Sequence, residues 1–484
     1  MAETIIKYFL YLSCIYFAQA EEFVNDTSYP RYHPAPPYGW MNDPNGLIFY
    51  KGLYHLFYQY NPKSSLEPGI ANWGHMKSHD LVHWEHLPIA MKPDQSYDKD
   101  GVFSGSAIVV NNELKLLYTG NSQKDNQITQ VQALATSEDG VNVQKYSGNP
   151  VIEGAEFQPS LRDPKVWKHG DTYYMVLGNS FENGTRGRVL LYSSKDLISW
   201  EYENVIDESD GTLGYMWECP DFFELNGKFV LLFSPQGVQP QGDKYRNLYQ
   251  CGYLVGDFDY TTKKFKRTND FVELDNGHDF YATQTTLNKH NQRVMVAWND
   301  MWETNYPESE QGFTGQMTIF RVLQLNKNNR LIQKPVSNLM SLRAKTLYSG
   351  YGREGKSVTL HNKAGEIFIS ASKNHDFILY IIGEKQSVTI SYSSANKTVT
   401  LDRGGKDGIR RASWNPRARL HWRIFIDASS VELFCGGGEV TFSSRFFPEG
   451  NIAAKIGNSS RADLFNVYNL RPSLCSHCML NISI

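Results

Sequence analysis

The segment YHLFYQYNP, Tyr54 to Pro62, is the first of five similar strand-like runs, and these runs decide the fold. The others begin at Leu114 (LKLLYTGNS), Tyr173 (YYMVLGNS), Phe229 (FVLLFSPQG) and Val294 (VMVAWND). Their starts are about sixty residues apart, a spacing typical of repeat architectures. Each unit holds several strand-like segments separated by Gly, Asn, Asp and Ser, without long helical periodicity. The pattern predicts an all-β fold with a five-bladed β-propeller.

The pattern changes after the fifth unit. Residues 336–349 leave the repeat and are predicted to be a linker. Alternating stretches such as EIFISASK, SVTISYSS and EVTFSSRFFP then predict an antiparallel β-sandwich over 350–472. We therefore expect a signal peptide (1–20), a propeller (21–335), the linker, the sandwich and a C-terminal tail (473–484).

The first twenty residues, MAETIIKYFLYLSCIYFAQA, contain a short apolar run that ends in Ala-Gln-Ala. This predicts a signal peptide cleaved after Ala20 and secretion of the protein; a buried or amphipathic N-terminal segment is the alternative. No later run has the roughly 18 apolar residues of a membrane span, so no membrane partner is expected. Secretion agrees with five N-glycosylation acceptor triplets, which begin at Asn25, Asn183, Asn396, Asn458 and Asn481.

Charge and motif content exclude several classes of function. A formal net charge of -3 over 484 residues argues against nucleic acid as a partner. The thirteen histidines show no metal-binding spacing, and no phosphate-binding or dinucleotide-binding glycine loop is present, so neither metal nor cofactor is expected. The cysteines of the mature chain are odd in number and show no dense spacing pattern, so disulfides are not expected to build the fold. Cys219 is predicted to be a free buried thiol, with a disulfide to Cys251 as the alternative.

Three acids occupy the same place in the repeat. Asp43, Asp163 and Glu218 each precede the strand-like run of their unit by ten or eleven residues. Ser104 and Gln284 hold the corresponding place in the other two units. Equivalent positions in successive blades surround one axis, so the five side chains should meet at one mouth of the central channel. Like charges gathered in one place add nothing to stability, which favours a functional site.

Paired carboxylates are the equipment of glycoside hydrolysis, in which one acid protonates the leaving oxygen and the other attacks the sugar or activates water. Aromatic side chains nearby suit a sugar, because a ring can lie on its C–H face. The aromatic candidates are Trp40, Trp73, Phe103, Trp217 and Trp298. The residues alone thus predict a cofactor-free glycosidase with a small-molecule sugar as substrate, and they leave the identity of the sugar open.

Several ordered motifs carry a more specific likeness. WMNDPNGL around Asp43, RDP at 162–164 and ECPD at 218–221 are accompanied by FYQYNP, WGH, FSGS, HDFYATQ and IDASSVELF. With these motifs nearly the whole mature chain resembles glycoside hydrolase family 32, the β-fructofuranosidases or invertases. The resemblance implies a five-bladed propeller with an appended β-sandwich. It also implies retaining hydrolysis of terminal β-D-fructofuranosides, of which sucrose is the commonest.

The resemblance assigns roles to individual residues. It makes Asp43 the nucleophile that forms a fructosyl-enzyme, Glu218 the acid/base and Asp163 the transition-state stabiliser, with Arg162 balancing the charge beside Asp163. The implied substrate-binding residues are Asn42, Gln59, Trp73, Phe103, Ser104, Arg162 and Trp298, with Tyr281 and Gln284 adjacent to the site. Thr283 departs from bacterial relatives, in which Pro is frequent at this place.

The mechanism requires Asp43 to be ionised while Glu218 is protonated, so the two carboxyls need different surroundings. Because Asp43 lies at a turn where backbone N–H groups can reach it, its pKa is expected to stay low. The same three acids would also serve a fructan hydrolase acting on inulin or levan, or a fructosyltransferase. A non-catalytic sugar-binding homologue is a further alternative, in which one acid would be expected to be lost.

Overall fold

The computed structural model describes residues 28–474. The predicted signal peptide and its cleavage site, two of the glycosylation triplets (Asn25 and Asn481) and two cysteines (Cys475 and Cys478) lie outside this range. The described chain forms seven sheets and three short 3-10 helices, η1 (Ala155–Phe157), η2 (Pro307–Gln311) and η3 (Ser337–Leu342). No helix within it is long and apolar enough to span a membrane.

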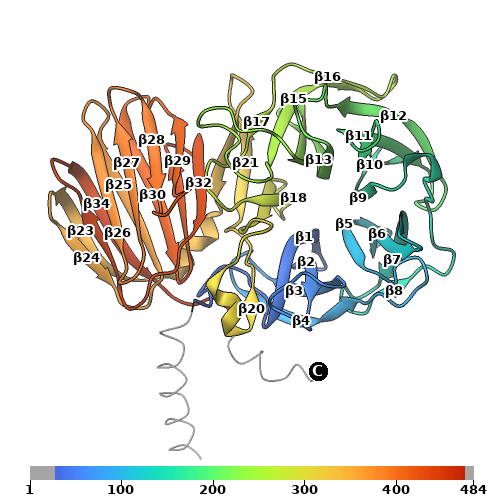
Figure 1. Cartoon of the computed structure of the whole chain (residues 1–484), viewed down its shortest axis with the longest axis horizontal. Coiled ribbons are helices and arrows are strands. Elements are labelled where there is room, and N and C mark those ends of the chain that lie inside the picture. Colours follow the sequence, from blue (N-terminus) through green and yellow to red (C-terminus); the bar gives the residue numbers. More distant parts are fainter. Residues whose placement is uncertain (1–27, 475–484) are drawn as a thin grey trace, which may run out of the picture.

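Five of these sheets surround a channel, toward which β1, β5, β9, β13 and β18 lie innermost (Figure 1). The first sheet contains β1 (Gly39–Tyr50), β2 (Leu53–Asn61), β3 (Asn72–Ser78), β4 (Trp84–Met91) and, parallel to β1, β20 (Phe313–Thr314). The second contains β5 (Val102–Val110), β6 (Glu113–Lys124), β7 (Gln127–Ser137) and β8 (Gln144–Lys145). The third contains β9 (Leu161–His169), β10 (Thr172–Phe181), β11 (Arg186–Ser194) and β12 (Trp200–Glu208). The fourth contains β13 (Met216–Leu225), β14 (Lys228–Gln236), β15 (Gly252–Asp259), β16 (Lys264–Arg267) and β17 (Val272–Glu273), and the fifth β18 (Tyr281–Leu287), β19 (Arg293–Trp298), β21 (Arg321–Leu325) and β22 (Leu331–Pro335).

The repeat read from the sequence corresponds to one strand in each of these sheets. The five runs are β2, β6, β10, β14 and β19, which in every case pair with the innermost strand of their sheet. The prediction of an all-β propeller is confirmed. Each run is flanked on both sides by strands, and its buried apolar residues pack against the neighbouring sheets.

The two remaining sheets form the sandwich on the other side of the molecule (Figure 1). One contains β23 (Arg343–Arg353), β34 (Arg461–Leu470), β25 (Gly365–Ser372), β30 (Arg419–Asp427), β31 (Ser430–Cys435) and β32 (Val440–Arg445). The other contains β24 (Ser357–Leu360), β33 (Ile452–Ile456), β26 (Phe377–Ile382), β27 (Ser387–Ser393), β28 (Thr398–Asp402) and β29 (Ile409–Ser413). β23 begins inside the segment 336–349 that was predicted to be a linker. The connection between the domains is therefore shorter than predicted and contains η3.

A β-bulge interrupts every innermost strand at the same level. In each sheet two residues of the inner strand face one residue of the second strand, which re-aims the side chains at that point. The bulged pairs are Asn42-Asp43, Phe103-Ser104, Asp163-Pro164, Cys219-Pro220 and Ala282-Thr283. Of the five residues predicted to meet at the channel mouth, Asp43, Ser104 and Asp163 lie in these bulges, Glu218 directly precedes one, and Gln284 directly follows one. The repeat in the sequence thus places the site, and the bulges set its geometry.

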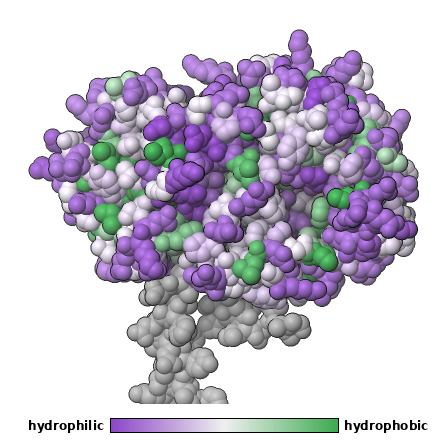
Figure 2. All heavy atoms as spheres, viewed as in Figure 1, coloured by the Kyte–Doolittle hydropathy of each residue, from purple (hydrophilic) through white to green (hydrophobic). Residues whose placement is uncertain are grey.

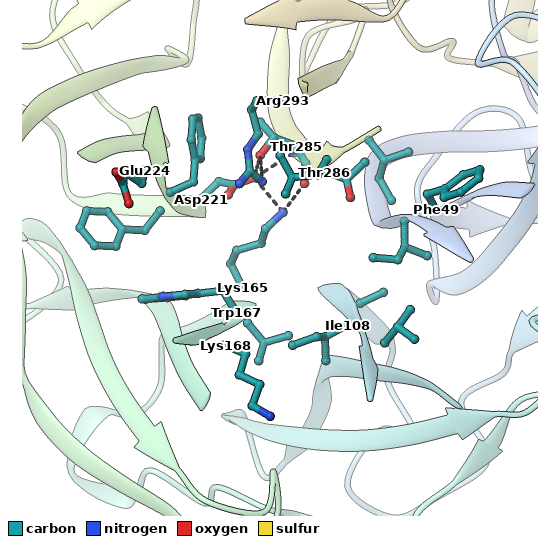
Figure 3. Close-up of a pocket in the computed structure, with 18 of the residues that line it drawn as sticks. Phe49, Ile108, Lys165, Trp167, Lys168, Asp221, Glu224, Thr285, Thr286 and Arg293 are labelled. Atoms are coloured by element: carbon teal, nitrogen blue, oxygen red, sulfur yellow. Dashed lines mark hydrogen bonds and ion pairs between the residues drawn. The ribbon is translucent and has the colours of Figure 1, made fainter. Parts of the chain in front are cut away.

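Polar contacts join neighbouring blades along the channel just beyond the bulges. Lys165 Nζ on β9 lies 2.8 Å from Asp221 Oδ2 on β13, and the same carboxylate oxygen accepts hydrogen bonds from Thr285 on β18. Figure 3 shows these side chains at the edge of a cavity of about 740 Å³. The cavity is lined by residues further along the same inner strands, and none of the three acids lines it. These contacts link the inner strands of three successive blades on the side of the bulges away from the acids.

The propeller and the sandwich share a continuous interface. Phe425, Phe434 and Leu470 of the sandwich pack in one apolar cluster with Phe320 and Met317 of the propeller chain. Buried ion pairs accompany this cluster. The face seen in Figure 2 is mainly hydrophilic, with only scattered apolar patches.

Candidate active site

The three predicted acids come together on the inner strands β1, β9 and β13. Cys219 lies among them: its Sγ is 3.5 Å from Oδ2 of Asp43 and 3.7 Å from Oδ2 of Asp163. Its backbone N–H donates a hydrogen bond of 2.9 Å to Oδ2 of Asp163. Asp163 is only 6% exposed, whereas Asp43 and Glu218 are partly exposed. The nucleophile and the acid/base candidates are therefore more exposed than the candidate stabiliser.

Asp43 is held by two strong donors. Ser104 Oγ donates to its Oδ2 at 2.7 Å, and Asn42 Nδ2 donates to its Oδ1 at 3.0 Å. Burial, together with the charge of Glu218, nevertheless raises the pKa of Asp43, and the donors only partly oppose this. The expectation of a low pKa was wrong, because the donors are side chains rather than backbone N–H groups and the bulge places the carboxyl beside other acids.

Asp163 adopts a positive φ of 66° at its bulge, which turns the side chain toward Cys219. Its own N–H donates to Thr119 Oγ1 at 3.0 Å, and this bond ties the bulge to the neighbouring blade. Burial raises the pKa of Asp163 to about 7; Arg162 opposes this rise, and the charges of Glu218 and Asp43 add to it. Asp163 therefore changes charge near neutral pH.

Glu218 is surrounded by hydrogen-bond donors. Arg162 donates from Nε at 3.0 Å and from Nη2 at 2.6 Å to Oε1. Tyr281 donates its hydroxyl at 2.6 Å, and Gln236 its amide at 2.9 Å, to Oε2. Arg162 opposes the rise in the pKa of Asp163, as expected, while its hydrogen bonds go to Glu218 and to Gln130. The positive charge thus directly contacts the acid/base candidate.

Of the remaining predicted residues, one is partly exposed and the others are buried. Phe103 is partly exposed at the site, and Gln59 donates to the carbonyl of Val102 beneath it. Trp73 is fully buried and donates to the carbonyl of Phe103 at 3.0 Å, so it supports the pocket from behind. Trp298 and Gln284 are also buried, Trp298 fully. The two ends of the Gln284 amide bind the backbone of Leu47 in the first blade and Gly105 in the second.

Two residues at the site escaped the sequence analysis. Gln236 contacts Glu218, and it lies seven residues into its repeat run, where the first and second runs carry Asn61 and Asn121. That recurring polar position was a usable signal. Trp302, in the loop after β19, stacks with Trp40 at a centroid distance of 6.1 Å and an interplanar angle of 19°. No repeat signal marked it, because the loop has no counterpart in the other units.

The prediction of a free buried thiol at Cys219 is confirmed. Cys219, Cys251 and Cys435 are buried free thiols, so the alternative disulfide between the first two is not formed. Burial, reinforced by Asp43 and Asp163, raises the pKa of the Cys219 thiol well above its usual value. It therefore stands among the acids as a neutral weak donor.

Three carboxyls gathered at the channel of a β-propeller, beside aromatic side chains and with a β-sandwich attached, define a glycoside hydrolase. The chain belongs to glycosyl hydrolases family 32: the family's N-terminal domain profile matches residues 33–335 and its C-terminal profile residues 331–469. The family predicted from the motifs is thereby confirmed.

Individual relatives agree with this placement. The chain is 39% identical to a sucrose-6-phosphate hydrolase of Escherichia coli over 444 residues, which cover 89% of this chain and 92% of the relative. It is 37% identical to a raffinose invertase of Escherichia coli over 438 residues, which cover 88% and 91%. The structure of a Bombyx mori GH32 beta-fructofuranosidase superimposes with a TM-score of 0.88 at 41% identity, covering 95% of this chain and 99% of that one. A mutant of that enzyme was solved in complex with sucrose.

Proposed function

We propose that the protein is a secreted, retaining β-fructofuranosidase that hydrolyses sucrose to glucose and fructose. The observation that carries the proposal is the convergence of Asp43, Asp163 and Glu218, each held by its own donors. The names of the relatives, among them an invertase and a beta-fructofuranosidase, support the substrate class.

In this proposal Asp43 attacks C2 of the fructosyl unit while Glu218 protonates the departing glucose oxygen, leaving a fructosyl ester on Asp43. Water then attacks C2, Glu218 takes its proton, and free Asp43 is restored. Asp163 would accept hydrogen bonds from fructose hydroxyls and oppose the positive charge that develops at C2. Asp163 and Asp43 both contact the Cys219 thiol, and this closeness to Asp43 suits the proposed role of Asp163.

The partners of Glu218 indicate which of its oxygens carries the proton. Oε1 faces two N–H groups of Arg162, which can only donate. Oε2 faces the Tyr281 hydroxyl and the Gln236 amide, and both of these groups contain an oxygen that can accept a hydrogen bond after reorientation. We therefore assign the transferable proton to Oε2. The arrangement accommodates both protonation states that the two steps require.

The test is release of glucose and fructose from sucrose by the purified protein. Equal amounts of both sugars are expected, and Asp43→Asn and Glu218→Gln should abolish release while the proteins remain folded. Glucose in excess of fructose would indicate transfer to another sugar. Sucrose 6-phosphate and inulin are the comparison substrates, and a strong preference for either would replace sucrose in the proposal.

Secretion requires its own test, because the signal segment lies outside the described residues. Three acceptor triplets within the described chain, at Asn183, Asn396 and Asn458, begin at exposed residues. Expression of the full chain in a secretory host should deliver protein to the medium that begins at residue 21 and loses mass on deglycosylation. Retention in the cell with the N-terminus intact would refute this part of the proposal.

A further inference from the structure

The loop 299–312, which connects β19 to β20 and contains η2, forms part of the aromatic wall beside the acids. Its Trp302 is partly exposed and lies against Trp298, at a centroid distance of 4.8 Å, and against Trp40. Trp40 donates its indole N–H to Asn42, which in turn donates to Asp43. The position of the loop therefore determines the aromatic surface next to the candidate nucleophile.

The sandwich holds both ends of this loop through one side chain. Arg445, at the end of β32, pairs with Asp300 through Nη1 and with Glu308 through Nη2, the latter at 2.6 Å. Its Nε donates to the carbonyl of Ser429 at 2.9 Å. The side chains of all three charged residues are fully buried. Arg445 thus clamps the two ends of a segment whose middle carries Trp302.

A second path links the sandwich to the same segment. The backbone N–H of Arg445 donates to Oδ2 of Asp279 at 2.6 Å, and Oδ1 of Asp279 accepts the hydroxyl of Tyr306 at 2.6 Å. The Tyr306 oxygen accepts the backbone N–H of Met301 at 2.9 Å. The residue immediately before Trp302 is therefore fixed by a chain of hydrogen bonds that begins at Arg445.

The clamp depends on the arginine. Two carboxyls share one guanidinium without exposure to water, and burial raises the pKa of both Asp300 and Glu308 against the opposing effect of Arg445. Without that guanidinium the carboxyls would have to take up protons or move into water, which opens the loop. Lysine keeps the charge but cannot span both carboxyls with a planar fork.

We propose that Arg445 is a positioning residue for the active site: through Asp300 and Glu308 it holds the loop whose Trp302 lines the sugar pocket. The sandwich thereby contributes to substrate binding as well as to the fold. The effect on substrate rests on the function proposed above, whereas the effect on the loop does not.

The experiment compares Arg445→Lys with Arg321→Lys. Arg321 is a matched control, because it is equally buried at the same interface, pairs with Asp275 at 3.0 Å and Glu432 at 2.5 Å, and forms its side-chain hydrogen bonds with residues outside 299–312 in the described part of the chain. Both variants should lower Tm. Only Arg445→Lys should speed hydrogen exchange in the 299–312 peptide and raise KM for sucrose about tenfold, with kcat changed less than about threefold. Trp302→Ala should reproduce the KM change and be non-additive with Arg445→Lys.

Equal exchange in the loop of both lysine variants would overturn the clamp. Faster exchange with an unchanged KM would overturn the role in binding and leave Arg445 structural. If Arg445→Lys does not fold, Glu308→Gln, which keeps Arg445 and Asp300, should show a smaller change of the same kind, and its absence would count against the proposal. A wild-type protein that leaves sucrose intact would refute the proposed function, and the exchange result would still decide the clamp.

Discussion

The hydroxyl of Ser104 donates a 2.7 Å hydrogen bond to Asp43, and removing it tests how the proposed nucleophile is kept ionised. Burial and the charge of Glu218 raise the pKa of Asp43, while donors from Asn42, Ser104 and Cys219 lower it. Ser104→Ala removes the shortest of these hydrogen bonds and introduces no new charge. The substitution should therefore raise the pKa of Asp43 further.

The size of the effect follows from the kind of bond. A hydrogen bond to a charged group is worth about 1.5–3 kcal/mol, and 1.36 kcal/mol corresponds to one pKa unit, so complete loss would amount to about one to two units. Asn42 and the Cys219 thiol stay in place and can strengthen their contacts, which favours the lower end. We expect the acidic limb of kcat/KM for sucrose to move up by about one pH unit in Ser104→Ala. Activity below the limb then falls about tenfold, and the plateau at higher pH is largely kept.

The assay is kcat/KM for sucrose between about pH 4 and pH 8, where the free enzyme's essential groups determine the profile. Ser106→Ala is the matched control: this serine lies on the same strand, accepts the N–H of Val166 at 3.0 Å and contacts none of the three acids. Its acidic limb should stay where the wild-type limb is. An unmoved limb in Ser104→Ala, or one displaced to lower pH, would refute the reasoning.

Three further predictions concern other groups of the molecule. Tyr281→Phe removes the hydroxyl from Oε2 of Glu218 and should lower kcat for sucrose about 10- to 100-fold with little change in KM; an unchanged kcat would exclude Tyr281 from proton transfer. Because the pKa of Asp163 is raised to about 7, the wild-type fold loses stability as pH rises from the ordinary carboxyl range to 7. Asp163→Asn has no carboxyl to titrate at this position. Its free energy of unfolding in urea, relative to that of the wild type, should therefore be about 2–3 kcal/mol higher at pH 8 than at pH 5. A difference from the wild type that does not depend on pH would contradict this. Burial lowers the pKa of His33, but its hydrogen bonds to Asp427 and Glu432 outweigh this and raise the pKa to about 9. The stabilisation by protonated His33 is complete below about pH 6.5 and is lost as the pH passes 9. The free energy of unfolding of the wild type should therefore fall by about 3 kcal/mol across this range relative to that of His33→Asn. Parallel pH profiles of stability for the two proteins would refute this.

The sequence predicted the architecture well because a propeller repeats one pattern. The second strand of each sheet is a buried apolar run bounded by turn residues. The regular spacing of these runs can be recognised in the sequence without knowing which strands lie next to them. The positions of Asp43, Asp163 and Glu218 followed from the same register. The domain boundary was less accurate, since the first strand of the sandwich, β23, is largely exposed or half-buried and lacks clear alternation.

The local geometry of the site could not be predicted, because it depends on bulges and on partners from other blades. Asp163 and Cys219 have positive φ angles. The motifs RDP and ECPD do not predict this, because neither Asp nor Cys is glycine, the residue that usually adopts such angles. The side chain of Arg162 forms hydrogen bonds to Glu218, 56 positions along the chain. Trp302 belongs to a loop without an equivalent in the other units, so no internal comparison could reveal it.

The two motifs RDPK and ECPD interlock at three successive levels between the third and fourth blades. Arg162 binds Glu218 at 2.6 Å, Asp163 binds the N–H of Cys219 at 2.9 Å, and Lys165 binds Asp221 at 2.8 Å. The two ion pairs lie on either side of the bulges and hold them at a fixed separation. Asp163 and Glu218 are therefore rigid with respect to each other. Asp43 comes from the first blade and is fixed to this unit only by the Cys219 thiol, with Ser104 holding it from the second blade. The proposed nucleophile thus has the fewest contacts with the other two acids, whereas the proposed acid/base and the proposed stabiliser are held to each other by contacts at three levels.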